Sequence, residues 1–227
     1  MLPGGDVDVV LETELSLKQL GKHLRRVGTQ VMILQYARVP IVKYVDQKTQ
    51  LPVDVSFSQN GILLNKLLEG ILPRFQDLEP LLFLVKCFVS GLDKLNDPSK
   101  GGLGSYSIFC LVVSFLQHNN ELEELQGDLS RLFRGFMKFW GSIFNSAALG
   151  VSLHAGGSFF AKNERVSADF RTALVLEDPL DALNNVSRAT HRWLDVRAAF
   201  ADASTRLESG SVSLASLMST IKFQRVP

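Results

Sequence analysis

The spacing of apolar residues changes near Asn60, and this change constrains the fold more than any other feature of the sequence. Before that point, short β-prone segments alternate between apolar and polar positions, as half-buried strands do. After it, apolar residues recur three or four positions apart, as they do on amphipathic helices. Strands followed by a run of helices are typical of an α+β protein. The chain has 227 residues, enough for one large domain or two small ones.

The N-terminal part is predicted to form a small, mostly antiparallel sheet with one helix laid on it. Ser16 is a candidate N-cap, and leucines follow it at helical spacing until the helix stops near Gly28. The residues Asp46-Gln47-Lys48-Thr49 should form a hairpin turn between the last two strands. The expected strands are Asp6–Glu12, Gln30–Ala37, Pro40–Val45 and Val53–Phe57.

The remainder of the chain is predicted to form a helical layer. The run Leu103–His118 is almost wholly apolar, so it should lie at the centre of that layer. Loops and short extended pieces should fill Leu149–Phe170, and a short strand at Leu174–Leu176 should end in the turn Glu177-Asp178-Pro179. The other expected helices are Ile62–Phe75 (interrupted at Pro73), Glu79–Leu95, Asp128–Phe144 and Val186–Leu207, with weak helical spacing in the tail at Leu214, Leu217 and Ile221.

Two aspartates stand two residues apart among the valines of the first expected strand. A strand sends residues i and i+2 to one face, so Asp6 and Asp8 should leave the same side of the sheet. Asp54 lies between valines on another short strand. Three carboxylates brought together raise one another's pKa unless a cation is present, and oxygen ligands suit Mg²⁺ or Mn²⁺. Because D-x-D pairs are common, this metal-binding interpretation depends on the third aspartate.

Composition limits the classes of function. The net charge of +1 creates no global field for nucleic acid, so any basic surface must be local. Cys87 and Cys110 lie in apolar runs and are interpreted as buried thiols in a reducing compartment. The N-terminus lacks the basic and apolar regions of a signal peptide, and the apolar runs are shorter than the roughly 20 residues of a membrane span. These features predict a soluble intracellular protein.

Five ordered blocks carry a resemblance to a known family. They are LPGGDVDVV, Ala37–Phe57, LFLVK, GGLGSYS and LEDPLDALNNVSR. In order and spacing they resemble the TRAMP-type noncanonical poly(A) polymerases, a branch of the DNA-polymerase-β-like nucleotidyltransferases that also contains the terminal uridylyltransferases. The resemblance implies a small palm sheet packed beside a larger, mainly α-helical central domain. It implies a partial palm domain at 1–58, a helical PAP-associated domain at 59–208 with a nucleotide-recognition loop near 176–188, and a tail at 209–227.

The resemblance implies a polynucleotide adenylyltransferase, which transfers AMP from ATP to the 3′-hydroxyl of RNA and releases pyrophosphate. Asp6, Asp8 and Asp54 would hold two Mg²⁺ or Mn²⁺ ions, which agrees with the chemistry expected of such carboxylates. Asp54 would lie nearest the RNA 3′-oxygen. Little other chemistry is needed, because phosphoryl-type transfers depend mainly on positioning and charge neutralisation.

The family pattern also implies the nucleotide-binding residues, at a site between the sheet and the helical layer. Asn65 would contact the sugar. Lys86 would contact the triphosphate, although a surface lysine that only buries its stem is the alternative. Ser105 would reach a phosphate from the start of its helix, where free N–H groups favour anions. Tyr106 would stack on the base, with a core aromatic as the alternative.

Two residues of the expected recognition loop bear on the choice of base. Asp178 would lie near the base edge, although a simple turn with an N-cap also accounts for Glu177-Asp178-Pro179. Uridylyltransferases of the family tend to carry a histidine at the place of Asn184, so Asn184 favours ATP over UTP. Two alternative functions stay open: a terminal uridylyltransferase, and a catalytically impaired fragment that acts as an interaction module.

The sequence departs from the family pattern in two places. The family has a Gly-Ser block, which holds the triphosphate, just before the Leu2-Pro3 with which this chain opens. The expectation is therefore an N-terminally truncated form, with the natural loss of a phosphate contact as the alternative. Ser90 stands where some relatives carry a second lysine, so weaker phosphate binding is expected.

The resemblance also implies partners and a location. The sequence shows no RRM or zinc knuckle, so RNA would be held by partners or by scattered basic residues. TRAMP-type relatives work with a zinc-knuckle RNA-binding subunit and an RNA helicase, which implies RNA surveillance in the nucleus or nucleolus, with the cytoplasm as the alternative and no membrane. The basic residues in question are Lys18, Lys22, Arg25, Arg26, Arg38 and Lys43.

Overall fold

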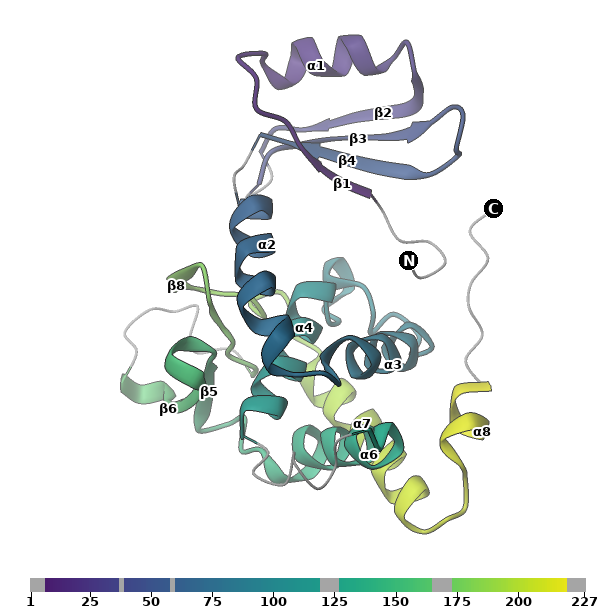
Figure 1. Cartoon of the computed structure of the whole chain (residues 1–227), viewed down its shortest axis with the longest axis vertical. Helices are drawn as coiled ribbons and strands as arrows, with labels where there is room; N and C mark the ends of the chain where they lie inside the picture. The colour runs from purple at the N-terminus through teal and green to yellow at the C-terminus, as the bar shows by residue number, and fades with distance from the viewer. Residues whose placement is uncertain (1–6, 37–38, 58–59, 119–126, 165–172, 220–227) are drawn as a thin grey trace. The chain divides into compact units, whose positions relative to one another are not determined.

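The computed structural model describes residues 7–36, 39–57, 60–118, 127–164 and 173–219. By the packing of its Cα atoms the chain divides into two compact units, Met1–Ile71 with Gln224–Pro227 and Leu72–Phe223 (Figure 1). The first unit contains the sheet, and the second is mainly helical. The mixed α+β class is thus confirmed. Among the described residues, no helix is both long enough and apolar enough to cross a membrane.

The first unit is built on a four-stranded sheet with the strand order β1-β4-β3-β2. Strand β1 runs parallel to β4, whereas β4 with β3 and β3 with β2 are antiparallel, which confirms the predicted, mostly antiparallel sheet. Helix α1 lies across one face of it (Figure 1). The elements are β1 (Val7–Val10), α1 (Leu17–Leu24), β2 (Gly28–Leu34), β3 (Ile41–Asp46), β4 (Pro52–Ser56) and α2 (Asn60–Ile71).

Helix α1 begins at a capping box. The hydroxyl of Ser16 accepts a hydrogen bond from the backbone N–H of Gln19, and the Gln19 side chain accepts one from the backbone N–H of Ser16. Leu20 is buried against the sheet, together with the valines of β3 and β4. This packing gives the sheet one apolar face, under α1, and leaves the polar residues of the same strands on the other face.

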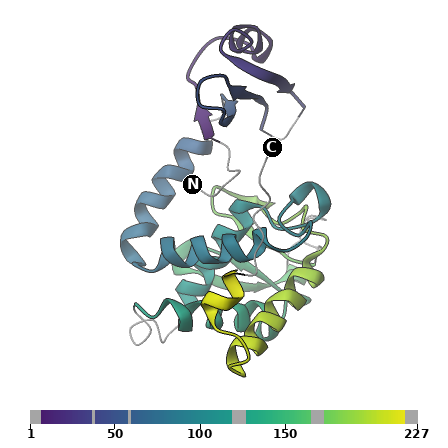
Figure 2. The same ribbon diagram turned by 90° about the vertical axis from the view of Figure 1, so that its right-hand side faces the viewer.

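The second unit is organised around α4, which is buried along nearly its whole length and confirms the predicted central helix. Helices α6 and α7 pack side by side, where the Phe136 and Phe200 rings meet with centroids 5.7 Å apart (Figure 2). Both cysteines are buried free thiols, as predicted. The elements are α3 (Leu78–Ser90), α4 (Ser105–His118), α6 (Leu129–Lys138), β5 (Leu149–Ser152), β6 (Ser158–Ala161), β7 (Glu177–Asp178), β8 (Asp181–Asn185), α7 (Trp193–Glu208) and α8 (Leu214–Ser219).

Two predictions for the segment from Glu177 onward were wrong. Glu177 and Asp178 form strand β7 rather than a turn, and β7 pairs with β8 in a hairpin. The last long helix starts at Trp193 instead of Val186. Between them, the Asn185 side-chain oxygen accepts hydrogen bonds from the backbone N–H and the hydroxyl of Ser187, at 3.0 and 2.8 Å. Such local side-chain bonds compete with helix formation, and apolar spacing does not reveal them.

Candidate active site

A row of charged side chains crosses the sheet on the face opposite α1. Asp8 of β1 is the register partner of Asp54 of β4, and Asp54 is in turn the register partner of Lys43 of β3. Neighbouring strands lie about 4.8 Å apart, so these side chains are direct neighbours on one face. The valines that flank the two aspartates belong to the core under α1. The alternation of the strands therefore presents the carboxylates together on the open face.

An ion pair joins two members of this row. The Lys43 ammonium lies 2.8 Å from Oδ2 of Asp54, whose side chain is 14% exposed. Asp8 is exposed. Adjacent carboxylate oxygens are hard ligands, so Asp8 and Asp54 fit a divalent cation. Asp6, the third predicted ligand, lies outside the described residues; within them, no group of three or more acidic, histidine or cysteine side chains could hold a metal ion. The set of three remains a prediction.

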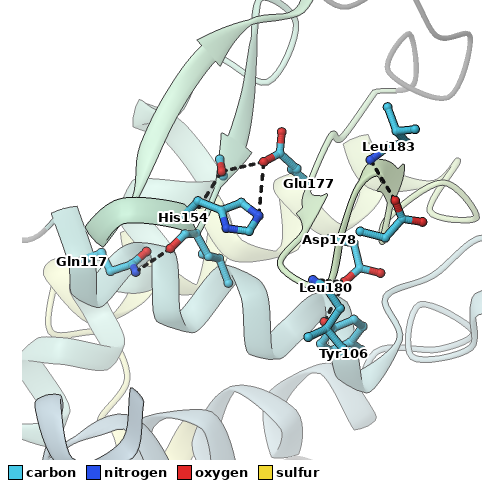
Figure 3. A network of polar contacts seen from close by, with 10 residues as sticks. Tyr106, Gln117, His154, Glu177, Asp178, Leu180 and Leu183 are labelled. Carbon is cyan, nitrogen blue, oxygen red and sulfur yellow. Dashed lines mark hydrogen bonds and ion pairs between the residues drawn. The ribbon is translucent and has the colours of Figure 1, made fainter. Parts of the chain in front are cut away.

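A second polar cluster, in the helical unit, centres on the Asp178 carboxylate. Its Oδ1 accepts hydrogen bonds from the Tyr106 hydroxyl and from the backbone N–H of Leu180, both at 2.9 Å (Figure 3). Its Oδ2 accepts a bond from the Asn184 side-chain amide at 2.6 Å. Asp178 is 9% exposed as a residue, and Asn184 is also buried. The structure thus brings together three of the predicted nucleotide-binding residues, Tyr106, Asp178 and Asn184.

Tyr106 is held as a hydrogen-bond donor. Burial of the hydroxyl, together with the neighbouring Cys110 thiol and Asp178 carboxylate, raises the pKa of Tyr106 far above its ordinary value. Burial, assisted by Asp178, likewise raises the pKa of Cys110. The Tyr106 ring is half-buried and stacks near Phe109, with centroids 6.2 Å apart and planes 8° from parallel. Stacking of Tyr106 on a base remains a prediction.

The remaining predicted residues are spread over three helices. Lys86 of α3 is half-buried and makes no hydrogen bond or ion pair to the described part of the chain. Ser105 is exposed as the first residue of α4. Asn65 falls in α2, but its side chain lies outside the described part. Ser90 donates its hydroxyl hydrogen to the Cys87 carbonyl of its own helix at 2.7 Å.

Packing explains the paired glycines before α4. Gly101 has a φ of +85°, and a Cβ there would lie 2.2 Å from Nε2 of His191. A Cβ on Gly102 would lie 2.2 Å from the Leu95 carbonyl oxygen. The Gly101 carbonyl accepts a bond from the Arg192 backbone N–H at 3.0 Å. The segment after β8 therefore holds the loop that leads to Ser105, and sequence reasoning missed this contact.

We expect Gly101→Ala to lower the free energy of unfolding by more than about 1 kcal/mol, because alanine at positive φ is strained and its Cβ displaces His191. Gly70→Ala is the matched control. It lies in α2 with no atom within 4 Å of the added Cβ, so it should stabilise the chain by roughly 0.5–1 kcal/mol. Chemical denaturation of the two variants measures both. A Gly101→Ala protein as stable as wild type would contradict this packing account.

Sequence reasoning also missed the buried carboxylate beside Asp178. Glu177 is 4% exposed, and its Oε1 accepts a hydrogen bond from the Ser152 hydroxyl at 2.9 Å. Nε2 of His154 lies 3.6 Å from the same oxygen (Figure 3). These contacts tie β7 to the β5 region. Glu177 therefore bonds to the β5 side of the hairpin, while Asp178 bonds to Tyr106 of α4.

A mixed sheet with in-register aspartates on its open face, followed by a helical unit, defines the chain as a nucleotidyltransferase core. Comparison with protein families supports this class. Residues 2–71 match the family described as Poly(A) RNA polymerase, mitochondrial-like, central palm domain. Residues 128–184 match the Cid1 family poly A polymerase.

Similar proteins specify the family. Poly(A) RNA polymerase cid14 of Schizosaccharomyces pombe is 33% identical over 232 residues, which cover 95% of this chain and 34% of the relative. The solved polymerase core of TRAMP, an RNA surveillance complex, is 30% identical with a TM-score of 0.81, and the match covers 98% of this chain and 77% of that one. The inactive non-canonical poly(A) RNA polymerase protein Trf4-2 of Drosophila melanogaster is 28% identical, over 91% of this chain and 55% of the relative.

The chain belongs to the family of Cid14/Trf4-type noncanonical poly(A) polymerases. It spans about a third of the length of curated relatives such as cid14.

Proposed function

We propose that the chain transfers AMP from ATP to the 3′-hydroxyl of RNA. The 3′-oxygen attacks the α-phosphorus, the bond from that phosphorus to the β-phosphate oxygen breaks, and pyrophosphate leaves while the hydroxyl proton passes to solvent. The observation that carries the proposal is the register pairing of Asp8 with Asp54 on the open face of the sheet. The names of the similar proteins, poly(A) RNA polymerase and the TRAMP polymerase core, support AMP as the transferred group.

We propose that Asp8 and Asp54, with Asp6, hold divalent metal, Mg²⁺ or Mn²⁺. Bound metal would neutralise the charge that develops on the attacking and leaving oxygens. The adjacent carboxylates of Asp8, which is exposed, and Asp54, which is partly buried, fit such ions, because carboxylate oxygens are the ligands that Mg²⁺ and Mn²⁺ prefer. The ion pair with Lys43 restrains the Asp54 carboxylate on the face where Asp8 also lies.

We propose that Tyr106, Asp178 and Asn184 of the helical unit recognise the base, with Lys86 and Ser105 of the same unit on the phosphates and Asn65 of the first unit on the sugar. The hydrogen bond from Asn184 to Asp178 orients the Asn184 amide with its nitrogen toward the carboxylate. An amide oxygen accepts up to two hydrogen bonds, so Oδ1 of Asn184 can accept one from the exocyclic amino group of adenine. Uracil presents a carbonyl oxygen in place of that amino group and gains no such bond.

We expect Asn184→His to raise the use of UTP relative to ATP by about tenfold, because an imidazole N–H can donate to a uracil carbonyl oxygen. One hydrogen bond of about 1.4 kcal/mol corresponds to this factor. The ratio of kcat/KM for the two nucleotides measures it. Asn96→His, in an exposed loop of the same unit, is the control and should leave the ratio unchanged. If the ratio of kcat/KM for UTP and ATP is the same in Asn184→His and Asn96→His, Asn184 does not contribute to the selection of the base.

RNA 3′ ends are the proposed acceptor. A zinc-knuckle RNA-binding subunit and an RNA helicase are the proposed partners, in RNA surveillance in the nucleus or nucleolus. The similarity to the core of TRAMP, an RNA surveillance complex, supports this assignment. Co-purification of the natural protein with both kinds of partner from nuclear extract would test it.

Primer extension on a short unstructured RNA tests the proposed reaction. Each NTP is supplied separately with Mg²⁺ or Mn²⁺, to this chain and to a version extended at its N-terminus. ATP-dependent laddering is the expected result. Laddering with UTP instead would identify a uridylyltransferase. If neither form extends RNA, the chain is a non-catalytic interaction module, in line with the inactive relative Trf4-2.

A further inference from the structure

The outer face of α1 carries a cluster of basic residues that the chemistry at the aspartates does not use. Lys18, Lys22, Arg25 and Arg26 are all exposed, on α1 or directly after it. Lys18 and Lys22 are four residues apart and lie on one face of α1, and Arg25 and Arg26 follow in the turn at its C-terminal end. These four residues form the α1 basic cluster.

The positive charge of the α1 basic cluster is not balanced locally. No carboxylate in the described ranges forms an ion pair with any of its four members. In the helical unit, by contrast, Lys138 pairs with Glu208 at 2.9 Å and Arg206 with Asp202 at 3.5 Å. Like charges one turn apart destabilise a helix, and the helix dipole offsets only part of that cost. A bound polyanion would remove the repulsion.

The turn between β3 and β4 extends the same positive surface. The Gln47 backbone N–H donates to the Val27 carbonyl at 3.1 Å, which holds this turn beside the end of α1. Lys48 is exposed there. The Asp46 carboxylate is turned toward its own loop: the backbone N–H and hydroxyl of Thr49, followed by the N–H of Lys48, lower the pKa of Asp46. The Asp46 carboxylate is therefore engaged by hydrogen bonds within its own turn and forms no ion pair with the described basic residues of the cluster.

The α1 basic cluster lies on the far side of the sheet from the aspartates. The leucines of α1 pack on the valine face, whereas Asp8 and Asp54 leave the opposite face. If an RNA chain binds at the cluster, the thickness of the sheet therefore separates the bound nucleotides from the aspartates, where the RNA 3′ end would react. Phosphates are the sequence-independent feature of single-stranded RNA, and lysine and arginine side chains bind them.

We propose that the α1 basic cluster binds RNA phosphates upstream of the 3′ end that reacts. This inference rests on the proposed function, because RNA is the polyanion that a poly(A) polymerase must hold. An acidic protein surface is the competing occupant. RNA is favoured because the cluster is a set of flexible, exposed cations along α1 and the turn after it, and such side chains bind phosphates.

Salt-dependent binding tests the proposal. The affinity of the whole chain for a labelled oligoadenylate of about 16 nucleotides is measured without ATP at several salt concentrations. Lys22→Gln/Arg26→Gln should weaken binding roughly tenfold at low salt and reduce the slope of log K against log salt by about 1.4, since each lost phosphate contact contributes about 0.7. Lys138→Gln/Arg206→Gln removes the same two charges elsewhere and should leave the slope unchanged. Lys22→Arg/Arg26→Lys keeps both charges and should keep the slope.

Primer length separates this inference from the proposed function. Lys22→Gln/Arg26→Gln should raise KM for a primer of about 16 nucleotides and leave extension of one of about 4 nucleotides unchanged. Equal slopes in the two Gln variants, with RNA still extended, would overturn the inference and leave the proposed function standing. If the wild-type chain does not extend RNA but the slope is reduced only in Lys22→Gln/Arg26→Gln, the proposed function is overturned and the inference stands. Tighter binding of polyglutamate than of RNA would assign the cluster to an acidic protein and overturn the inference.

Discussion

Asp54→Ala should reduce AMP transfer by on the order of 10³-fold, because metal coordination contributes several kcal/mol to the stability of the transition state. Asp54 is the central member of the charged row, between Asp8 and Lys43. Without its carboxylate, Asp8 loses the in-register neighbour with which it would share a cation, and Lys43 loses its ion pair with Asp54. Single-turnover extension of RNA measures the loss, and Mn²⁺ titration should show weaker metal binding.

The fold should survive this substitution. The Lys43 side chain is 39% exposed, so water solvates its ammonium once the partner is gone, and we expect a change in unfolding free energy within about 1 kcal/mol. Asp46→Asn is the control: it changes another aspartate of the same sheet, whose carboxylate bonds to its own turn. It should keep its activity. Retained AMP transfer by Asp54→Ala would refute the metal assignment. Loss of AMP transfer in both Asp54→Ala and Asp46→Asn would indicate damage to the sheet.

Asp178→Asn should have the next largest effect. The Asp178 carboxylate accepts three hydrogen bonds, and an asparagine would present an N–H₂ group to the Tyr106 hydroxyl or to the Asn184 amide. A buried donor that loses its acceptor costs about 1–3 kcal/mol. We therefore expect unfolding free energy to fall by this amount, and kcat/KM for ATP to fall by on the order of 10²-fold, since one such loss is worth up to two factors of ten.

A double-mutant cycle with Asn184→Ala isolates the contact at 2.6 Å. The coupling energy between the two positions should reach about 1 kcal/mol or more, because both residues belong to one buried network. Asp202→Asn, an exposed aspartate of the same unit, is the control and should change neither stability nor the kinetics with ATP. Additive effects at Asp178 and Asn184 would show that their hydrogen bond does not organise the site.

Local patterns in the sequence predicted much of the fold. The capping box at Ser16, the alternation around Asp54 and the apolar run of α4 each depend on residues near one another in the chain, and the structure has the expected element in each place. The failures fall where side-chain hydrogen bonds between segments decide. The long helix starts at Trp193 because Asn185 and Ser187 bond to Leu176 and Leu174, nine and thirteen residues earlier in the chain.

The sequence by itself determined which side chains could do the chemistry: aspartates two apart in a strand, a third on another strand, and a tyrosine at the start of an apolar helix. Only the tertiary structure decided which of them meet. Register pairing sets Asp8 beside Asp54, and the folding of the β7–β8 hairpin against α4 brings Asp178 to Tyr106, 72 residues away. The physical reason is that spacing along a chain gives the face a residue occupies, whereas its neighbours across strands and helices depend on how the whole core packs.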